Sequence, residues 1–112
     1  MEFQVTELGT AKKVALHGRL DTTGVDRIET RFIASIVPSG LNTLIDLSGV
    51  EFVSSMGIRL LIMTARSLRH RKAQMVVFGA QPLVKESLDH VSLHHIVPVV
   101  ANESEALGLL QG

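Results

Sequence analysis

Two adjacent serines, Ser54 and Ser55, lie where a short loop leads into a predicted helix. A hydroxyl at this position can cap the helix by accepting a hydrogen bond from a free backbone N–H group. It can also carry a phosphoryl group, because the positive end of the helix dipole favours an anion there. Such a group would add a charge of about −1.5 to −2 beside anything docked at the helix start. The residues alone leave both roles open, the cap and the phosphorylation switch.

The helix that follows, predicted from Ser54 or Ser55 to about Arg71, carries two apolar stripes. At about 100° per residue, the stripe that faces the predicted sheet comprises Ile58, Leu61, Ile62, Ala65 and Leu68. The opposite stripe comprises Met56, Leu60 and Met63, with Arg59 and Arg66 on the flank between the two. A helix on one face of a sheet needs only one apolar stripe. The second stripe is therefore either covered by the neighbouring helix or binds a partner, which could be a second copy of the chain in a homodimer.

The other chemically suggestive residues have simpler explanations. His90, His94 and His95 have a spacing that can bind zinc on a helix, but the predicted helix ends near His90, so we expect no metal and no cofactor. The basic run over 66–72 suits a helix C-terminus, with an acidic partner patch as the alternative. The chain has no phosphate-binding loop or nucleophile-elbow motif, so we expect a binding protein and not an enzyme. A small-ligand carrier is a third hypothesis.

The composition argues against several further classes of protein. Eleven Lys and Arg residues balance eleven Asp and Glu residues among 112, which argues against nucleic acid or an anionic membrane surface as the main partner. Because the chain has no cysteine, thiol catalysis, disulfides and thiolate metal sites are excluded. No apolar stretch approaches the roughly 18 residues of a membrane helix, and the first residues do not resemble a signal peptide. We therefore expect a cytoplasmic protein without membrane insertion.

The rest of the chain predicts the elements that position the two serines. Apolar runs predict strands over Phe3–Glu7, Lys13–His17, Asn42–Leu47, Gln74–Phe78 and Ile96–Val100, the first two joined in a hairpin. Helices are predicted from Asp21–Thr23 to Pro38, from Ser54 or Ser55 to about Arg71, over Pro82–His90 and over Glu103–Leu110, the last capped by Asn102. Residues 48–57, SGVEFVSSMG, are expected to form a loop that leads into the second helix. This order predicts one α/β domain over residues 1–112, with a mixed, mostly parallel sheet of about five strands and about four helices.

Three segments of the sequence carry the pattern of a known family. They are HGRLD at 17–21, LIDLSGVEFVSSMGIRLL at 44–61 and MVVFGAQPLVKESLDHVSLHHIVPVV at 75–100. Together they resemble the STAS domain, the fold of bacterial anti-sigma factor antagonists. The first resembles the end of a family strand, and the last resembles the closing strand, helix and strand. The middle segment resembles the family signature, in which Asp-Ser-Ser-Gly leads into a helix. In phosphorylated family members, the modified serine directly follows that Asp. In FVSSMG this serine is Ser55, and Gly57 and Ile58 also match.

The resemblance implies a cycle of partner binding. The unphosphorylated protein would bind an anti-sigma factor that is also a serine kinase, and would so free a sigma factor. Phosphorylation of Ser55 would end this binding, and a serine phosphatase would restore it. Taken together with the second apolar stripe, the resemblance predicts a partner-binding surface of Asp21, Ser54, Ser55, Met56, Gly57, Arg59, Leu60 and Met63.

Two residues depart from the family pattern. Ser54 replaces the Asp and so removes a negative charge beside the acceptor, whereas Met56 replaces the second Ser and makes the surface more apolar. Both leave the hydroxyl of Ser55 in place. The departures motivate an alternative function, in which the chain is a non-phosphorylated STAS scaffold or an accessory subunit of a signalling or transport complex.

Overall fold

The computed structural model describes residues 1–111 and has the predicted α/β fold. In chain order it contains β1 (Glu2–Leu8), β2 (Ala11–Leu20), α1 (Thr22–Ile36), β3 (Asn42–Val53), α2 (Ser55–His70), β4 (Met75–Phe78), α3 (Pro82–His90), a 3₁₀ turn (Leu93–His95), β5 (Val99–Val100) and α4 (Glu103–Gln111). The five described strands form one sheet in the order β1-β2-β3-β4-β5. β1 and β2 form the predicted antiparallel hairpin, and every other pair is parallel. The mixed, mostly parallel sheet is therefore confirmed.

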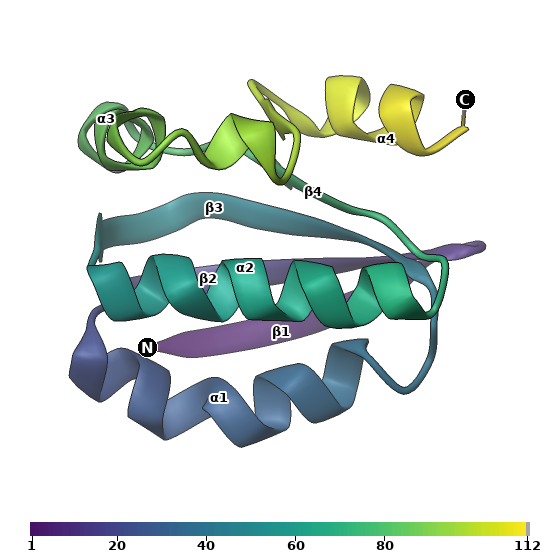
Figure 1. Cartoon of the computed structure of the whole chain (residues 1–112), viewed down its shortest axis with the longest axis horizontal. Coiled ribbons are helices and arrows are strands. Elements are labelled where there is room, and N and C mark those ends of the chain that lie inside the picture. Colours follow the sequence, from purple (N-terminus) through teal and green to yellow (C-terminus); the bar gives the residue numbers. More distant parts are fainter. Residues whose placement is uncertain (112) are drawn as a thin grey trace.

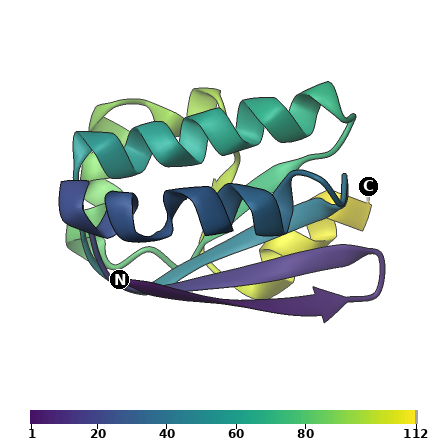
Figure 2. The same ribbon diagram turned by 90° about the horizontal axis from the view of Figure 1, so that it is seen from below.

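The helices cover the two faces of the sheet unequally (Figures 1 and 2). Successive side chains of a strand point to opposite faces. Ile45 and Val77 accordingly lie in the main core, together with the buried side chains of α1, α2 and α3. Leu44 and Val76 lie in a smaller core that is closed by α4. α1 and α2 therefore lie side by side on one face, while α4 packs on the other.

β3 differs most from the prediction, because it continues through the expected loop to Val53. The added residues pair in parallel with the end of β2, His17 with Gly49 and Leu20 with Val53. Val50 and Val53 of this segment are buried in the main core. Long-range pairing with β2 therefore fixes the segment as a strand, although its Ser, Gly and Glu residues do not predict one. The strand consequently brings the chain directly to the first residues of α2.

The last strand is shorter than predicted, since it spans Val99–Val100 and not Ile96–Val100. The backbone N–H groups of Ile96 and Val97 donate to the carbonyl of Leu93 at 2.8 and 2.9 Å. These two residues therefore belong to the turn that closes on Leu93, and of the predicted strand only Val99 and Val100 pair with β4.

The start of α4 is fixed by its own polar side chains. Asn102 caps the helix as predicted, with its Oδ1 accepting a hydrogen bond from the Glu105 N–H at 2.9 Å. In the first turn, Glu103 accepts a hydrogen bond from the Lys13 ammonium group of β2 at 2.9 Å. The ion pair ties the helix to the sheet.

Candidate docking surface around Ser55

The two serines at the start of α2 have different roles. Ser54 is the N-cap, because its Oγ accepts a hydrogen bond from the Gly57 N–H at 3.2 Å. The same hydroxyl donates to the carbonyl of Leu20 at 3.3 Å, and the Ser54 N–H donates to that carbonyl at 3.0 Å. The hydroxyl of Ser54 is thus engaged as both donor and acceptor, and it fastens the start of α2 to the end of β2.

Gly57 allows the first turn of α2 to lie close against β2 and β3. A Cβ atom at this position would collide with the carbonyl oxygen of Leu20, and it would lie 3.1 Å from Cγ2 of Val53. The prediction that Gly57 belongs to the exposed binding surface is corrected here, because the residue is buried. Because Gly57 has no side chain, the turn that carries both serines can pack closely against the sheet.

Ser55 is the first residue of α2, and it is exposed. Within residues 1–111, the hydrogen bonds at this helix start involve the hydroxyl of Ser54 and none involves that of Ser55. The first turn of α2 contains no acidic residue. The hydroxyl of Ser55 therefore faces solvent at a helix end whose partial positive charge no side chain of that turn complements.

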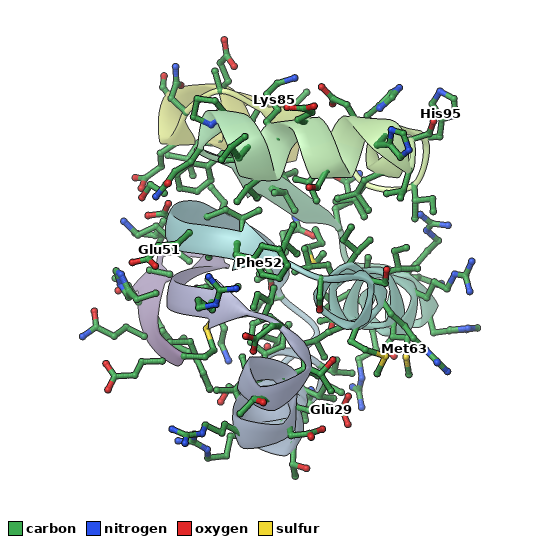
Figure 3. The ribbon with its side chains drawn as sticks, turned by 90° about the vertical axis from the view of Figure 1, so that its left-hand side faces the viewer. Glu29, Glu51, Phe52, Met63, Lys85 and His95 are labelled. Carbon is green, nitrogen blue, oxygen red and sulfur yellow. The ribbon has the colours of Figure 1, made fainter. Side chains whose placement is uncertain are left out.

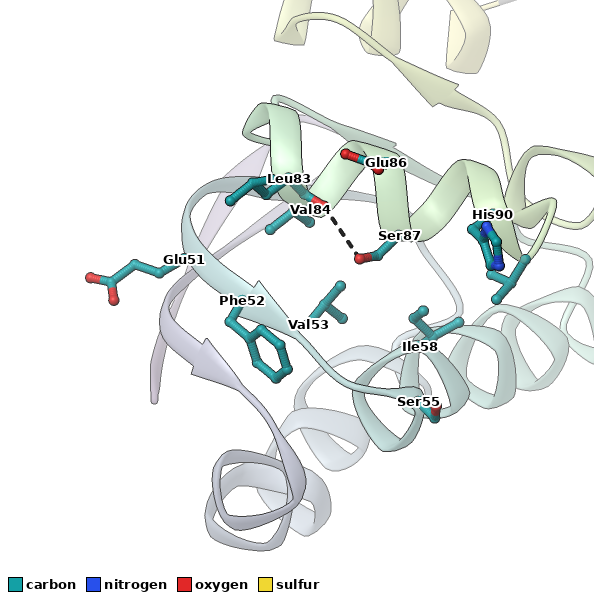
Figure 4. A pocket seen from close by; sticks show the side chains of 11 residues that line it. Glu51, Phe52, Val53, Ser55, Ile58, Leu83, Val84, Glu86, Ser87 and His90 are labelled. Atoms are coloured by element: carbon teal, nitrogen blue, oxygen red, sulfur yellow. Dashed lines mark hydrogen bonds between the residues drawn. The ribbon is translucent and has the colours of Figure 1, made fainter.

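A groove of about 500 Å³, which we call the α3 groove, separates the end of β3 from α3 and begins at Ser55 (Figure 4). Its apolar lining comes from Phe52, Val53, Ile58, Leu83, Val84 and Val91. Glu51, Glu86, Ser87 and His90 supply its polar lining. The hydroxyl of Ser87 donates to the Leu83 carbonyl of its own helix at 3.2 Å, so it is already engaged.

A second groove of about 550 Å³, which we call the α2 groove, follows the outer side of α2. It is lined by Ser55, Ile58, Arg59, Ile62, Met63, Arg66 and Val91. Ser55, Ile58 and Val91 line both grooves. The exposed hydroxyl of Ser55 therefore lies where the two grooves meet.

Exposed apolar side chains gather on the elements around Ser55. Of the seven large apolar side chains exposed within residues 1–111, five belong to this region, namely Phe52, Met56, Met63, Leu83 and Val91. Figure 3 shows two of them, Phe52 at the end of β3 and Met63 on the outer side of α2. Gathered apolar side chains of this kind mark interaction surfaces more often than scattered ones do. The exposed apolar side chains therefore extend beyond the predicted binding surface, which included Met56 and Met63 but not Phe52, Leu83 or Val91.

Sequence reasoning missed three of these five side chains. Phe52 was hidden in the segment expected to be a loop, and Val91 lies just beyond the end of α3. Leu83 is 74% exposed, whereas Val84 and Leu88 of the same helix are buried. The spacing of Val84 and Leu88 was a usable signal, because a stripe through these residues leaves Leu83 on a different side of the helix.

Leu60 is corrected from the predicted binding surface to the core. Its side chain is 2% exposed and lies in the same buried cluster as the side chains of α1. Met56 and Met63, the other members of the predicted stripe, are 38% and 44% exposed. α1 lies against α2 on this side and leaves no room for solvent at Leu60. The neighbouring helix thus accounts for one residue of the stripe and leaves the two methionines accessible.

Asp21 caps α1 beside the docking surface. Its Oδ1 accepts a hydrogen bond from the Gly24 N–H at 2.8 Å, and its Oδ2 accepts one from Arg19 Nε at 3.4 Å. The Gly24 N–H, with a smaller contribution from Arg19, holds the pKa of Asp21 below its usual value. The guanidinium of Arg19 also lies 4.6 Å from the centre of the Phe52 ring. Arg19 thus links the carboxylate of Asp21 to the exposed ring of Phe52.

The three histidines considered above lie on two different elements. His90 lines the α3 groove, whereas His94 and His95 lie on the 3₁₀ turn with ring centres 4.4 Å apart. Within residues 1–111, no three His, Cys, Asp or Glu side chains come together in a way that could hold a metal ion. No helix in the same part of the chain has the length and apolar character needed to cross a membrane.

Comparisons with known proteins identify the family to which this fold belongs. BtrV of Bordetella bronchiseptica, named as an anti-sigma factor antagonist, is 26% identical over 91 residues, which cover 81% of this chain and 78% of BtrV. A solved anti-sigma-factor antagonist (STAS) domain protein from Planctomyces limnophilus is 23% identical, covers 98% of both chains and gives a TM-score of 0.86.

SpoIIAA, an anti-sigma factor antagonist from Bacillus, has the same fold at 20% identity. Its unphosphorylated form covers 99% of this chain and 97% of its own, with a TM-score of 0.80. Its phosphorylated form covers 96% and 97%, with a TM-score of 0.69. The family model of the STAS domain matches residues 2–106. A match over nearly the whole length shows that this chain belongs to the STAS domain family.

Proposed function

We propose that this protein is an anti-sigma factor antagonist that is switched by phosphorylation of Ser55. The observation that carries the proposal is the division of labour between two serines. Ser54 already caps α2, so the exposed hydroxyl of Ser55 is not needed for that cap. That hydroxyl lies where two grooves meet among exposed apolar side chains. The names of BtrV and SpoIIAA support an anti-sigma factor as the class of partner.

In the unmodified protein, the exposed apolar side chains would bind an anti-sigma factor that is also a serine kinase. Burying them would contribute about 25 cal/mol per Å² of apolar surface removed from water. Met56 and Met63 suit such a contact, because the flexible thioether side chain adapts to the shape of its partner. Binding of the kinase in the cytoplasm would free the sigma factor it holds.

Phosphorylation would then end the binding. Ser55 Oγ attacks the γ-phosphorus of ATP bound to the kinase, the bond to the β,γ-bridging oxygen breaks, ADP leaves and the hydroxyl proton passes to a base of the kinase. The new charge of about −1.5 to −2 is tolerated by the helix start but not by an apolar interface, which would have to desolvate it. A serine phosphatase would use water to release inorganic phosphate and restore the hydroxyl.

Intact mass spectrometry tests the acceptor. The protein is mixed with ATP and with each purified ATPase of the histidine-kinase-like fold that the genome of its host encodes. We expect the wild-type protein to gain one phosphoryl group and Ser55→Ala to gain none. Ser54→Ala should still be modified, since its neighbour supplies the hydroxyl. Modification of Ser55→Ala at the wild-type rate would assign the phosphate to another residue.

Binding measurements test the switch. We expect Ser55→Asp to weaken binding to the kinase roughly tenfold or more, because it places a charge in an apolar interface. Ser55→Ala should bind like the wild type. Ser104→Asp is a matched control, because Ser104 is also exposed in the first turn of a helix, on the other face of the sheet. Equal binding by both Ser55 variants would contradict the switch and favour the scaffold alternative.

A further inference from the structure

The two grooves that meet at Ser55 carry opposite charges. The α3 groove is lined by the carboxylates of Glu51 and Glu86, and no Arg or Lys lines it. The α2 groove is lined by Arg59 and Arg66, and no carboxylate lines it. Ser55 therefore lies on the boundary between an acidic and a basic groove. An anion at this position is repelled from one side and attracted to the other.

Arg59 is the nearest basic residue to Ser55 along α2. Residues four apart lie on one face of a helix, with Cβ atoms about 5–6 Å apart, and an anion is favoured N-terminal to a cation. Both residues line the α2 groove. Arg59 is exposed, and its guanidinium takes part in no ion pair among residues 1–111. It is thus available to an anion on Ser55 or to one carried by a docked partner.

The α2 groove defines the chemistry of a segment that would fit it. Ile58, Ile62 and Met63 supply an apolar lining, and Arg59 and Arg66 lie on the same side of the helix, two turns apart. Such a groove is complementary to a segment with apolar side chains and carboxylates at its edge. A segment with basic edges would meet like charges, so we take the occupant to be an acidic, apolar segment of the partner.

We propose that Arg59 transmits phosphorylation of Ser55 to the bound partner by changing its own ion partner. This proposal rests on the proposed function. In the unmodified protein, Arg59 pairs with a carboxylate of the acidic segment in the α2 groove. In the modified protein, Arg59 pairs with the phosphoryl group one turn away. Phosphorylation then acts twice on the partner, because it adds a negative charge beside the groove and withdraws the cation that held the partner's carboxylate.

A titration that needs no partner tests the phosphate half of the proposal. Phosphoserine is installed at position 55 by genetic encoding, and its ³¹P chemical shift is followed against pH. Arg59 stabilises the dianion, so in Arg59→Gln the midpoint of the second ionisation should rise by about half a pH unit. Glu51, Glu86, His90, Arg19 and Arg66 also face this region. These groups are the same in the wild type and in Arg59→Gln, so the difference between the two midpoints is due to Arg59.

Two further variants sharpen the titration. Arg59→Lys keeps the charge but loses the two-pronged geometry, and its midpoint should lie between those of the wild type and Arg59→Gln. Arg71→Gln is the matched control, because Arg71 lies at the opposite end of α2, about 24 Å along the helix axis. It should titrate like the wild type. An unchanged midpoint in Arg59→Gln would overturn the pairing whether or not a kinase is ever found.

Binding to the kinase that phosphorylates Ser55 tests the partner half. We expect Arg59→Glu to weaken binding of the unmodified protein roughly tenfold or more, and Arg71→Glu to leave it unchanged. Undiminished binding by Arg59→Glu, with Ser55→Asp still blocking, would overturn the role of Arg59 and leave the proposed function standing. Loss of the Ser55→Asp effect would instead remove the proposed function, while the ³¹P result would still decide the pairing.

Discussion

The starts of α2 and α4 have similar frameworks but are completed differently. Each is capped by a polar side chain, Ser54 for α2 and Asn102 for α4, and each has an exposed serine in its first turn. α4 adds Glu103 and Glu105 to that turn, and Glu103 binds Lys13 of the sheet. α2 adds no carboxylate and is surrounded by exposed apolar side chains.

The difference separates a helix start completed by its own residues from one left incomplete. The partial positive charge of α4 is met by carboxylates in the same turn. At the start of α2, no carboxylate of the first turn balances the partial positive charge. A phosphoryl group on Ser55 would balance it. A phosphate there would supply the charge that the other helix obtains from its own sequence, and so the local fold can carry the modification without strain.

The largest expected effect distinguishes core from surface within α2. Leu60→Ala should lower the free energy of unfolding by about 3 kcal/mol, because it leaves a cavity in the main core. Met63→Ala should change that free energy by less than about 1 kcal/mol and weaken kinase binding instead. Urea denaturation and binding measurements on both variants check this division. Equal losses of stability would mean that Met63 also packs into the fold.

A smaller effect compares the two caps. Ser54→Ala and Asn102→Ala should each lower the free energy of unfolding by about 1 kcal/mol. Only Ser54→Ala should also slow phosphorylation of Ser55, since the cap positions the neighbouring hydroxyl. Denaturation midpoints and initial phosphorylation rates provide the measurements. A slower rate in both variants would point to general loosening of the fold and not to positioning.

The smallest expected effect is the pH dependence of the free energy of unfolding, which has opposite signs for Asp21 and for Lys13. Asp21 has a pKa below 3.8, so its stabilising contribution is present above that value and is lost as pH falls through the lowered pKa. Hydrogen bonding from Lys13 to Glu103, together with their attraction, raises the pKa of Lys13 above 10.5. Its contribution is present below that value and is lost as pH rises through the raised pKa.

Denaturation midpoints across pH check this pair of predictions. Asp21→Asn should remove part of the loss of stability in acid, and Lys13→Gln should remove part of the loss in alkali. Both groups are near solvent, so the effects should be small and should shrink further with added salt. An alkaline effect for Asp21→Asn would contradict the assignment of its partners.

Local signals predicted the parts of the fold that local chemistry determines. The helix starts at Ser54 and Asn102 followed from capping residues, and the buried stripe of α2 followed from its spacing. The extension of β3 could not be read from 48–53, because it depends on pairing with residues of β2 about thirty positions earlier. Local signals therefore placed the serines correctly but not the strand that leads to them.

The candidate site was predicted only in part for the same reason. Ser55 was selected by the family resemblance, since capping chemistry alone does not distinguish it from Ser54. Leu60 was placed on the surface because a helical wheel does not show where α1 lies. Leu83 and Val91 lie near Ser55 only because α3 and the turn after it pack over the end of β3, and no pattern within α3 reveals this packing.

The close seating of Gly57 against Leu20 has a consequence for substrate recognition. The turn that holds Ser55 is fixed to the sheet by the Ser54 hydroxyl and by a contact that tolerates no side chain. A kinase acting on this serine would meet a preformed three-dimensional epitope and not an extended, pliable peptide. A synthetic peptide of residues 44–61 should therefore be a poor substrate, although it contains every residue of the signature.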